Sequence, residues 1–354
     1  MDKVRLGVIG CGGMCKAHLL SVGGKSEQIS EQYRPFAEQI EVRGLADVNL
    51  ERAEQYRREF GGDYVTDDVE KVFTDPDIDA VLITTWHDTH GPFSVRAMEC
   101  GKHVLIEKPM AMTEHECDQI LEAEEKSGVN YMVAFRVRFA RGTQDVKREI
   151  PNPDNIMANA RYTGIWSEGV WAQDPIKGGG QILSQGCHVV DLMFYLAGSE
   201  PAELWATGGM YHHEKPEPLD TINAAIRFEN GATGCFMGGD GGTGGILHGH
   251  PLPCGCPFWV TVVGKGRSAT AIDHGHDARF ESCDPEWTIP YANREYGSEL
   301  GERPAGGVPD ILPAFAMSII RGEKPIATAK DGARVTRFIL RCFESAKTGK
   351  VMRF

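Results

Sequence analysis

The first fifteen residues constrain the fold more than any other stretch, because a short apolar run there meets a turn rich in glycine. Residues 4–9, VRLGVI, are apolar on both faces, which predicts a strand buried on both sides of a parallel sheet. The segment 10–15, GCGGMC, interrupts this run, and residues 16–20 read as the start of a helix. The chain therefore begins with a strand, a glycine turn and a helix, the opening of an α/β doubly wound sheet.

This turn has the features of a dinucleotide-binding site. Gly10 permits the tight turn, and Gly12 lets a pyrophosphate approach bare backbone at the helix N-terminus. In the G-x-G-x-x-G pattern the third glycine falls at Cys15, whose small thiol still allows the helix to pack closely on the sheet. Gly13 and Met14 complete the set of predicted cofactor contacts in the turn. Glycine also serves tight turns that bind nothing, so the motif indicates a cofactor only together with residues elsewhere in the chain.

An acidic residue follows the second predicted strand, residues 41–46. Asp47 stands at its tip, where a carboxylate accepts hydrogen bonds from the ribose hydroxyls of the adenosine half and repels a 2′-phosphate. Because the next residue, Val48, supplies no cation, the sequence favours NAD over NADP. In the alternative interpretation Asp47 caps a helix that opens in residues 47–53, and the two roles can coexist.

Two further loops are predicted at the carboxyl ends of parallel strands, where doubly wound sheets bind ligands. The strand 78–84 is followed by the loop 85–90, in which Thr85 and His90 are candidate cofactor contacts, and then by a helix through residue 98.

The next strand, residues 103–106, ends in Glu107, Lys108 and Pro109. Its position predicts that Lys108 points an ammonium group toward the cleft. The bond before a proline can be cis at a cost of about 0.5–1 kcal/mol, which would fix the preceding side chain. A solvated surface lysine is the alternative.

The order of these motifs resembles the Gfo/Idh/MocA oxidoreductase family, which includes inositol dehydrogenases and glucose-fructose oxidoreductase. The resemblance rests on Gly10-Cys11-Gly12, His18, Asp47, His90, Glu107-Lys108-Pro109, and the segments 178–180, 186–191, 322–325 and 330–332. It covers nearly the whole chain and implies an NAD(P)-dependent enzyme with Lys108 and His188 as catalytic residues. Glu107 is assigned to the cofactor only through this motif.

Length and charge agree with such an enzyme. The 354 residues have room for two domains, expected as a Rossmann domain (1–130) and a substrate and oligomerisation domain (131–354) whose C-terminal helix can pack back on the first. The net charge of −13 argues against nucleic acid or an anionic membrane as partner. No run of eighteen apolar residues and no signal peptide is present, and the ten cysteines are scattered, which predicts a cytoplasmic protein with reduced thiols.

The second half changes to strands joined by short turns. After a sixth strand at 131–135, Arg136 and Arg138 alternate on an extended segment and can face the cleft or the solvent. The later strands are expected at 155–165, 202–212, 219–228, 231–237 and 258–264. Their alternation predicts a large, open, mostly antiparallel sheet with one covered face. The resemblance implies that the open face mediates self-association, giving a homodimer or homotetramer.

A helix predicted at 181–196 places Ser184, His188 and Asp191 on one face. Histidine suits a general base, because its ordinary pKa of about 6.5 lets it accept an alcohol proton at neutral pH. The resemblance implies that role for His188, with Lys108 stabilising the alkoxide; a core histidine is the alternative. Ser184 departs from the family, many members of which carry aspartate there. Either proton transfer relies on Lys108 and His188 with some loss of driving force, or the substrate or another carboxylate such as Asp174 completes the site.

Other candidates surround this helix. Trp166 and Trp171 can stack on a sugar ring or pack in the core, and Lys177 can contact a hydroxyl or be solvated. The glycine run 238–245 is not flanked by a strand and a helix, so it favours a mobile loop over the substrate rather than a phosphate cradle.

A group of metal-competent side chains follows that run. His248, His250, Cys254 and Cys256 are possible zinc ligands, but their spacing matches no common zinc motif. A metal is therefore possible but unsupported, and residues 274–277, which include two histidines, are read as a polar turn.

The sequence thus predicts an NAD(P)-dependent oxidoreductase acting on a secondary hydroxyl, or the corresponding ketone, of a sugar, cyclitol or glycoside. Trp171, Arg138 and Ser184 join Lys108 and His188 as predicted substrate contacts. One alternative is a redox-neutral lyase or glycosidase that acts through a keto-sugar. Another, which only Ser184 supports, is an NAD-binding sensor without catalysis.

Overall fold

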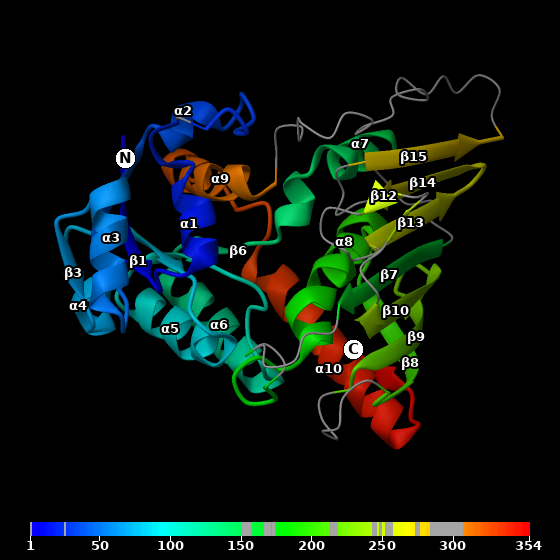
Figure 1. Cartoon of the computed structure of the whole chain (residues 1–354). Helices are drawn as coiled ribbons and strands as arrows, with labels where there is room; N and C mark the ends of the chain where they lie inside the picture. The colour runs from blue at the N-terminus through cyan, green and yellow to red at the C-terminus, as the bar shows by residue number, and fades with distance from the viewer. Residues whose placement is uncertain are drawn as a thin grey trace. The chain divides into compact units, whose positions relative to one another are not determined.

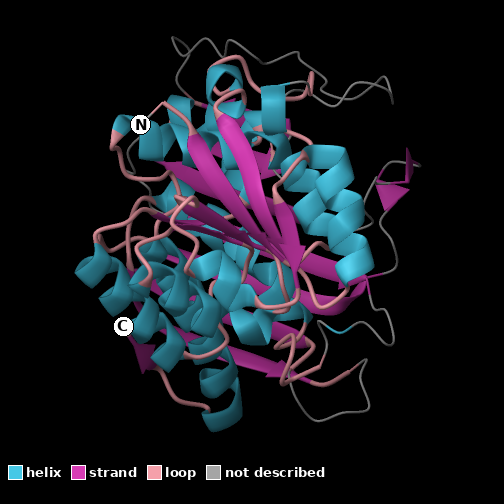
Figure 2. Cartoon of the chain, turned by 90° about the vertical axis from the view of Figure 1, so that its left-hand side faces the viewer, coloured by secondary structure: helices cyan, strands magenta, loops and turns pink. Residues whose placement is uncertain are grey.

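The computed structural model describes residues 2–24, 26–150, 157–165, 171, 174–211, 219–242, 246–247, 250–251, 258–272, 277–283 and 307–354. The chain forms two compact units: Met1–Phe139 with Ala305–Thr336, and Ala140–Pro304 with Arg337–Phe354. The division into domains at residue 130 stays a prediction. Figure 2 distinguishes the helices and strands of both units by colour.

The first unit contains a six-stranded parallel sheet with the order β3-β2-β1-β4-β5-β6. Its strands are β1 (Val4–Ile9), β2 (Ile40–Ala46), β3 (Tyr64–Thr66), β4 (Ala80–Ile83), β5 (His103–Ile106) and β6 (Tyr131–Val133). This order confirms the predicted doubly wound sheet. The strand order reverses between β1 and β4, and ligands bind at the carboxyl ends of the strands beside that point.

Helices cover both faces of this sheet. They are α1 (Gly13–Leu19), α2 (Arg34–Ala37), α3 (Leu50–Phe60), α4 (Val69–Phe73), α5 (His87–Glu99), α6 (Glu114–Ser127) and α9 (Val308–Arg321), with 3₁₀ turns η1 (Val22–Gly24) and η2 (Arg136–Phe139). Figure 1 shows α1, α2 and α9 on one side of the sheet, with α5 and α6 on the other. The side chains of β1 alternate accordingly. Leu6 packs in the core that contains Phe315 of α9, whereas a Cβ on Gly7 would lie 2.6 Å from Val72 of α4.

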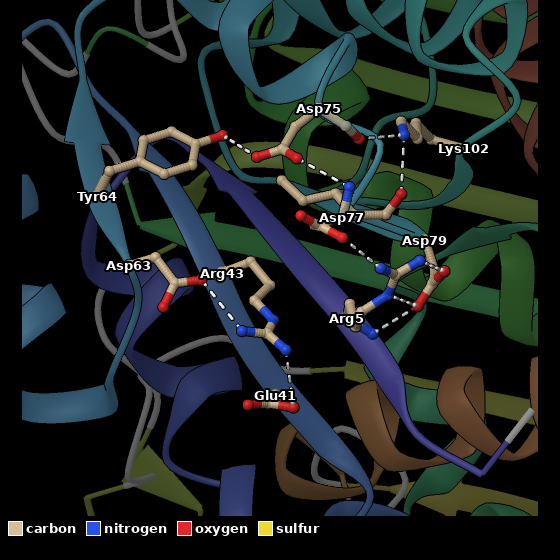
Figure 3. Close-up of polar contacts among 10 residues, drawn as sticks. Arg5, Glu41, Arg43, Asp63, Tyr64, Asp75, Asp77, Asp79 and Lys102 are labelled. Atoms are coloured by element: carbon tan, nitrogen blue, oxygen red, sulfur yellow. Dashed lines mark hydrogen bonds and ion pairs between the residues drawn. The ribbon is translucent and has the colours of Figure 1, made fainter.

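Polar contacts join the beginnings of these strands (Figure 3). Asp79 accepts hydrogen bonds from the backbone N, Nε and Nη2 of Arg5 at 2.9, 2.9 and 2.7 Å. The ammonium of Lys102 donates to the carbonyls of Asp75 and Ile78 at 2.6 and 2.8 Å. These bonds tie β1, β4 and the turn before β5 together, so this group has a structural role.

Replacing Asp79 by alanine is expected to lower the free energy of unfolding by about 2–3 kcal/mol at pH 7, because three donors of Arg5 lose their acceptor. Burial raises the pKa of Asp79, but the hydrogen bonds from Arg5 outweigh it and leave the pKa below its ordinary value. The stabilisation is therefore complete above pH of about 4 and disappears as the pH falls through the folded-state pKa. Urea unfolding of the wild type and Asp79→Ala at several pH values measures this difference.

The matched control for this prediction is Asp77→Ala. The Asp77 side chain is 78% exposed and makes an ion pair with Nη1 of Arg5 at 2.9 Å, so its removal is expected to cost less than about 1 kcal/mol. If both variants lose the same free energy of unfolding, the three hydrogen bonds to Asp79 contribute no more to stability than the ion pair with Asp77.

The second unit contains an eight-stranded sheet with the order β15-β14-β13-β7-β10-β9-β8-β16. Its strands are β7 (Met157–Ile165), β8 (Pro201–Gly209), β9 (Thr221–Phe228), β10 (Thr233–Gly242), β13 (Phe258–Gly264), β14 (Arg267–Ile272), β15 (Asp277–Ser282) and β16 (Met352–Arg353); β11 (Ile246–Leu247) and β12 (His250–Pro251) pair separately. Only β7 and β10 run parallel among the described strand pairs of this sheet. The mostly antiparallel sheet is confirmed.

One face of this sheet is covered by α7 (Arg141–Glu149) and α8 (Cys187–Ala197), and by the part of α10 (Ala329–Thr348) that belongs to this unit. Phe338 of α10 meets Phe194 and Phe236 edge to face. Along β9, buried and exposed residues alternate strictly. The sheet therefore has one apolar, covered face and one open face, as its sequence pattern predicts.

Three local predictions are wrong. Gly238–Gly242 continue β10 rather than forming a loop. Gly238 and Gly239 pair with β7 on one side and β9 on the other, and Gly242 pairs with β7; residues 243–245 lie outside the described residues. The segment after β6 is not extended, since Arg136–Phe139 form the 3₁₀ turn η2. The helix predicted at 181–196 is interrupted, because Ile182–Gly186 form a π-helix before α8.

No helix within the described part of the chain combines the length and the apolar character needed to cross a membrane.

Candidate functional site

The glycines of the turn between β1 and α1 have two different roles, one in packing and one in binding. Gly10 has a φ of +88°, and a Cβ there would lie 2.9 Å from both the carbonyl O of Thr84 and Cγ2 of Thr85. A Cβ on Gly12 or Gly13 would meet no atom within 4 Å. Gly10 is thus required by the fold itself, whereas Gly12 and Gly13 leave bare backbone facing open space, which fits the approach of a pyrophosphate.

The rest of the turn agrees with that fit. Cys15, at the third glycine position, is fully buried, so its thiol is accommodated between helix and sheet. Met14 is 39% exposed. The first amides of a helix have no carbonyl partner within the helix, and α1 begins at Gly13, so these amides are suited to bind an anion.

Asp47 connects the end of β2 to this turn. Its Oδ2 accepts from the amide N of Cys11 at 2.6 Å, and its Oδ1 accepts from the amide N of Asn49 at 2.7 Å. Nη2 of Arg52 lies 2.8 and 3.1 Å from the two oxygens. The Asp47 side chain is 3% exposed and that of Arg52 is 45% exposed. The guanidinium is therefore the more accessible charge at this corner.

The surroundings of Asp47 differ from the prediction in two respects. The residue that caps α3 is Asn49, whose side chain accepts from the amide N of Arg52. Val48 supplies no cation, as the sequence shows, but the first turn of α3 brings the guanidinium of Arg52 to the carboxylate, a contact that the prediction from sequence does not include. Arg52 reaches Asp47 because α3 begins at Leu50, which puts Arg52 in its first turn.

His90 joins the loops after β4 and β5. It is fully buried, with Nδ1 2.8 Å from the carbonyl O of Pro109 and Nε2 3.3 Å from that of Thr85. Burial lowers the pKa of His90, so the imidazole is neutral and donates to only one of these oxygens, Pro109 being the nearer. The predicted loop 85–90 is shorter than expected, because α5 begins at His87. Cofactor contacts of Thr85 and His90 stay predictions.

Glu107 and Lys108 stand where β5 ends. Oε1 of Glu107 lies 2.8 Å from Nε2 of His18, and Oε2 accepts from the amide N of Lys108 at 3.2 Å. Burial raises the pKa of Glu107, but the hydrogen bond from His18 and the charge of Lys108 outweigh it and lower the pKa overall. The peptide bond between Lys108 and Pro109 is cis.

Arg138 makes two polar contacts within the first unit. It is 2% exposed, its Nη1 donates to the carbonyl of Ile326 at 2.6 Å, and its Nη2 lies 3.1 Å from Oδ1 of Asp331. Burial raises the pKa of Asp331, but the charges of Arg138 and Arg334 outweigh it and hold the pKa at about 2. Substrate contact by Arg138 stays a prediction.

In the second unit, Ser184, His188 and Asp191 are all buried. His188 and Asp191 lie one turn apart on α8, whereas Ser184 belongs to the preceding π-helix, so the even spacing expected for one α-helix does not apply. Asp174 accepts from the backbone amides of Ile176 and Lys177 and thereby organises a turn.

The remaining candidates divide into described and undescribed residues. Trp171 is 37% exposed, and its contact with a substrate stays a prediction. Trp166, His248, Cys254, Cys256 and residues 273–276 lie outside the described residues, as does the side chain of His250. Among the side chains that are described, no three potential ligands gather into a metal site.

Sequence reasoning missed the roles of three residues. His18 is part of the family motif but has no function assigned from the sequence, and Arg52 belongs to no motif. Tyr56, also on α3, donates from its hydroxyl to the carbonyl of Gly12 at 3.1 Å and so supports the turn. Each contact depends on how separate elements pack together, so no local pattern indicates it.

Comparison with known proteins agrees with this geometry. Residues 4–135 match the model of an oxidoreductase family with an NAD-binding Rossmann fold, and residues 154–246 match the C-terminal domain of the same family. The chain belongs to the Gfo/Idh/MocA oxidoreductase family. The predicted family membership and an NAD-binding first domain are thereby confirmed.

Members of the Gfo/Idh/MocA family with known activities are similar along much of the chain. A 1,5-anhydro-D-fructose reductase from Ensifer adhaerens is 27% identical over 88% of this chain and 90% of its own. A levoglucosan dehydrogenase from Pseudarthrobacter phenanthrenivorans is 30% identical over 66% of this chain and 67% of its own. An oxidoreductase domain protein from Kribbella flavida has the same fold, with a TM-score of 0.82, 21% identity and coverage of 100% and 99% of the two chains.

Proposed function

We propose that this Gfo/Idh/MocA oxidoreductase transfers hydride between a nicotinamide and a carbon that bears a secondary hydroxyl in a sugar, cyclitol or glycoside. The observation that carries the proposal is that one unit contains both the open glycine turn at Gly12 and Lys108, which follows β5. Both lie at the carboxyl edge of one parallel sheet, where a nicotinamide and its substrate meet in this architecture. The similar reductase and levoglucosan dehydrogenase act on sugar derivatives.

The roles follow from the chemistry of each side chain. The dinucleotide, when bound, accepts or donates the hydride. The ammonium of Lys108 stabilises negative charge on the substrate oxygen as the carbon–hydrogen bond breaks. His188 takes the hydroxyl proton as general base. Ser184 and Trp171 belong to the proposed substrate site, with Ser184 offering a hydrogen bond but no charge.

A substrate screen tests this function. Purified protein is incubated with a panel of sugars, cyclitols and glycosides, each with NAD and with NADP, while absorbance of the reduced nicotinamide is followed. Stoichiometric reduction with one substrate class supports the proposal. Glycoside cleavage with only catalytic NAD would support the redox-neutral alternative, and tight NAD binding without any turnover would support the sensor.

The cofactor preference depends on Asp47 and Arg52, and we propose that NAD is preferred. Replacing Arg52 by methionine is expected to weaken NADPH binding about tenfold while changing NADH binding less, because the guanidinium is the cation available to a 2′-phosphate. Dissociation constants of both reduced cofactors, from fluorescence titration, measure the effect. Arg58→Met is the control, since Arg58 lies on the same helix and pairs with Glu54. An equal loss for both cofactors would contradict the assignment.

We also propose a cytoplasmic homodimer or homotetramer that associates through the open face of the second sheet. Trp205, 46% exposed on β8, and Trp259, partly buried on β13, support this, because large apolar side chains on a sheet face favour association. Sedimentation of wild type and Trp205→Glu tests it; an unchanged monomeric mass in both would contradict it.

A further inference from the structure

A buried pair joins the helix of the glycine turn to the loop that carries Lys108. His18 lies on α1 and is fully buried, and the side chain of Glu107 is 8% exposed. Nε2 of the imidazole lies 2.8 Å from Oε1 of the carboxylate. The pair spans 89 residues of sequence within one compact unit. The position of the loop is thus linked directly to the helix that follows the cofactor turn.

The backbone of Lys108 is held on both sides. The second oxygen of Glu107 accepts from the amide N of Lys108 at 3.2 Å. Beyond the next peptide bond, the carbonyl O of Pro109 lies 2.8 Å from Nδ1 of His90. Glu107 therefore uses one oxygen for α1 and the other for the peptide that carries the lysine, so it transmits a constraint from His18.

The charge of Glu107 depends on the same contact. Three charged or titratable groups face it: His18 from α1, His90 from α5 and Lys108 from its own loop. Burial alone raises the pKa of this carboxyl, and the hydrogen bond from His18 is the largest contribution that lowers it. Without that donor the carboxyl would take up a proton at a higher pH than in the wild type.

The imidazole itself has a defined arrangement. Its Nδ1 is buried and has no hydrogen-bond partner among the residues that the structure describes. The tautomer with the proton on Nε2 satisfies the ionised carboxylate, whereas a proton on Nδ1 would leave a buried donor unsatisfied. His18 is thus suited to donate one hydrogen bond to Glu107.

We propose that His18 is a positioning residue that acts through Glu107: its hydrogen bond keeps this carboxylate ionised and oriented, and so holds the Lys108 peptide in place for reaction. The proposal rests on the role of Lys108 in the proposed function. It assigns to α1 a part in catalysis besides the binding of the dinucleotide.

The test compares three variants with the wild type. His18→Leu removes the donor, and His18→Gln replaces it with an amide N–H of similar reach. Ser21→Ala is the matched control, because Ser21 is fully buried and its Oγ donates to the carbonyl of His18 at 2.7 Å without touching Glu107. If His18→Leu does not fold, His18→Asn takes its place, since its shorter amide does not reach the carboxylate.

Two measurements decide the outcome. In the cofactor-free protein, the infrared spectrum of His18→Leu is expected to show a protonated carboxyl band at neutral pH that is absent from wild type and His18→Gln. A fourth variant, His18→Leu combined with Glu107→Gln, assigns the band, which should be absent because the carboxyl itself is removed. In the active enzyme, His18→Leu is expected to lower kcat about tenfold or more, with activity recovering as rising pH ionises Glu107. His18→Gln and Ser21→Ala should keep the wild-type pH profile.

The proposal is overturned if His18→Leu shows neither the band nor the altered profile. It is equally overturned if all three variants lose activity together without a change of profile, which would indicate a structural role. Full activity of Lys108→Met would instead refute the role of Lys108 in the proposed function, and the infrared band would still report whether His18 controls the carboxyl. No turnover of any substrate by the wild type would refute the proposed function itself.

Discussion

Replacing Lys108 by methionine is expected to lower kcat/KM by about 10²–10³-fold, because the variant lacks the preorganised charge that we propose next to the reacting oxygen. Such a loss corresponds to about 2.7–4 kcal/mol of transition-state stabilisation. Methionine keeps the length and the apolar stem of the side chain, so Glu107 and the cis peptide at Pro109 should be unaffected. Steady-state kinetics on the best substrate of the screen provides the measurement.

The dissociation constant of NADH separates the two ways in which this variant can fail. If Lys108 acts on the substrate oxygen, kcat falls while NADH binding changes little. Lys126→Met is the control: Lys126 is 73% exposed on α6 and pairs with Glu122 on the same helix, so its loss should leave the rate unchanged. A Lys108→Met enzyme with wild-type kcat/KM would remove the lysine from the mechanism.

The sequence predicts local features of this site well. The strand β1, the glycine turn and the position of Lys108 after β5 all follow from short apolar runs and the residues that end them. These features need no information from elsewhere in the chain, because burial on both faces and glycine geometry are properties of the segment itself. The doubly wound sheet in turn follows from the alternation of such strands with helices.

Contacts between separate elements are not predictable in the same way. The pairing of Arg52 with Asp47 depends on α3 starting one residue after Asn49, and the contact of His18 with Glu107 depends on α1 lying over the end of β5. Glycine-rich β10 reads as a loop because glycine disfavours strands, yet pairing on both sides holds it extended. Packing and pairing between elements decide each of these cases.

The π-helix before α8 cannot be predicted from the local sequence, for a related reason. Residues 182–186 have the composition of an ordinary helix, and only the packing of the second unit shows that the turn is widened there. Such turns are frequent at functional sites. Ser184 lies in the π-helix and His188 in the α-helix that follows it. The π-helix would therefore also determine where an aspartate at position 184 lies relative to His188.

Replacing His188 by glutamine is expected to lower kcat for oxidation by about 10²–10⁴-fold, since the base that takes the hydroxyl proton is removed. Glutamine retains a hydrogen-bonding side chain of similar size in a position that is 3% exposed, so the fold should tolerate it. In the wild type, activity is expected to fall on the acid side, where the proposed base becomes protonated. In the variant this limb should disappear, and the residual rate should rise with hydroxide. The pH dependence of kcat measures both effects.

Ser184→Asp provides the matched comparison in the same segment. A carboxylate there would favour the protonated imidazole, so the acid limb is expected to move to higher pH while the maximal rate stays close to wild type. This shift requires that residue 184 and His188 interact across the π-helix. If Ser184→Asp leaves the profile unchanged while His188→Gln abolishes the limb, the serine has no part in the base, and the charge that assists His188 must come from elsewhere in the site.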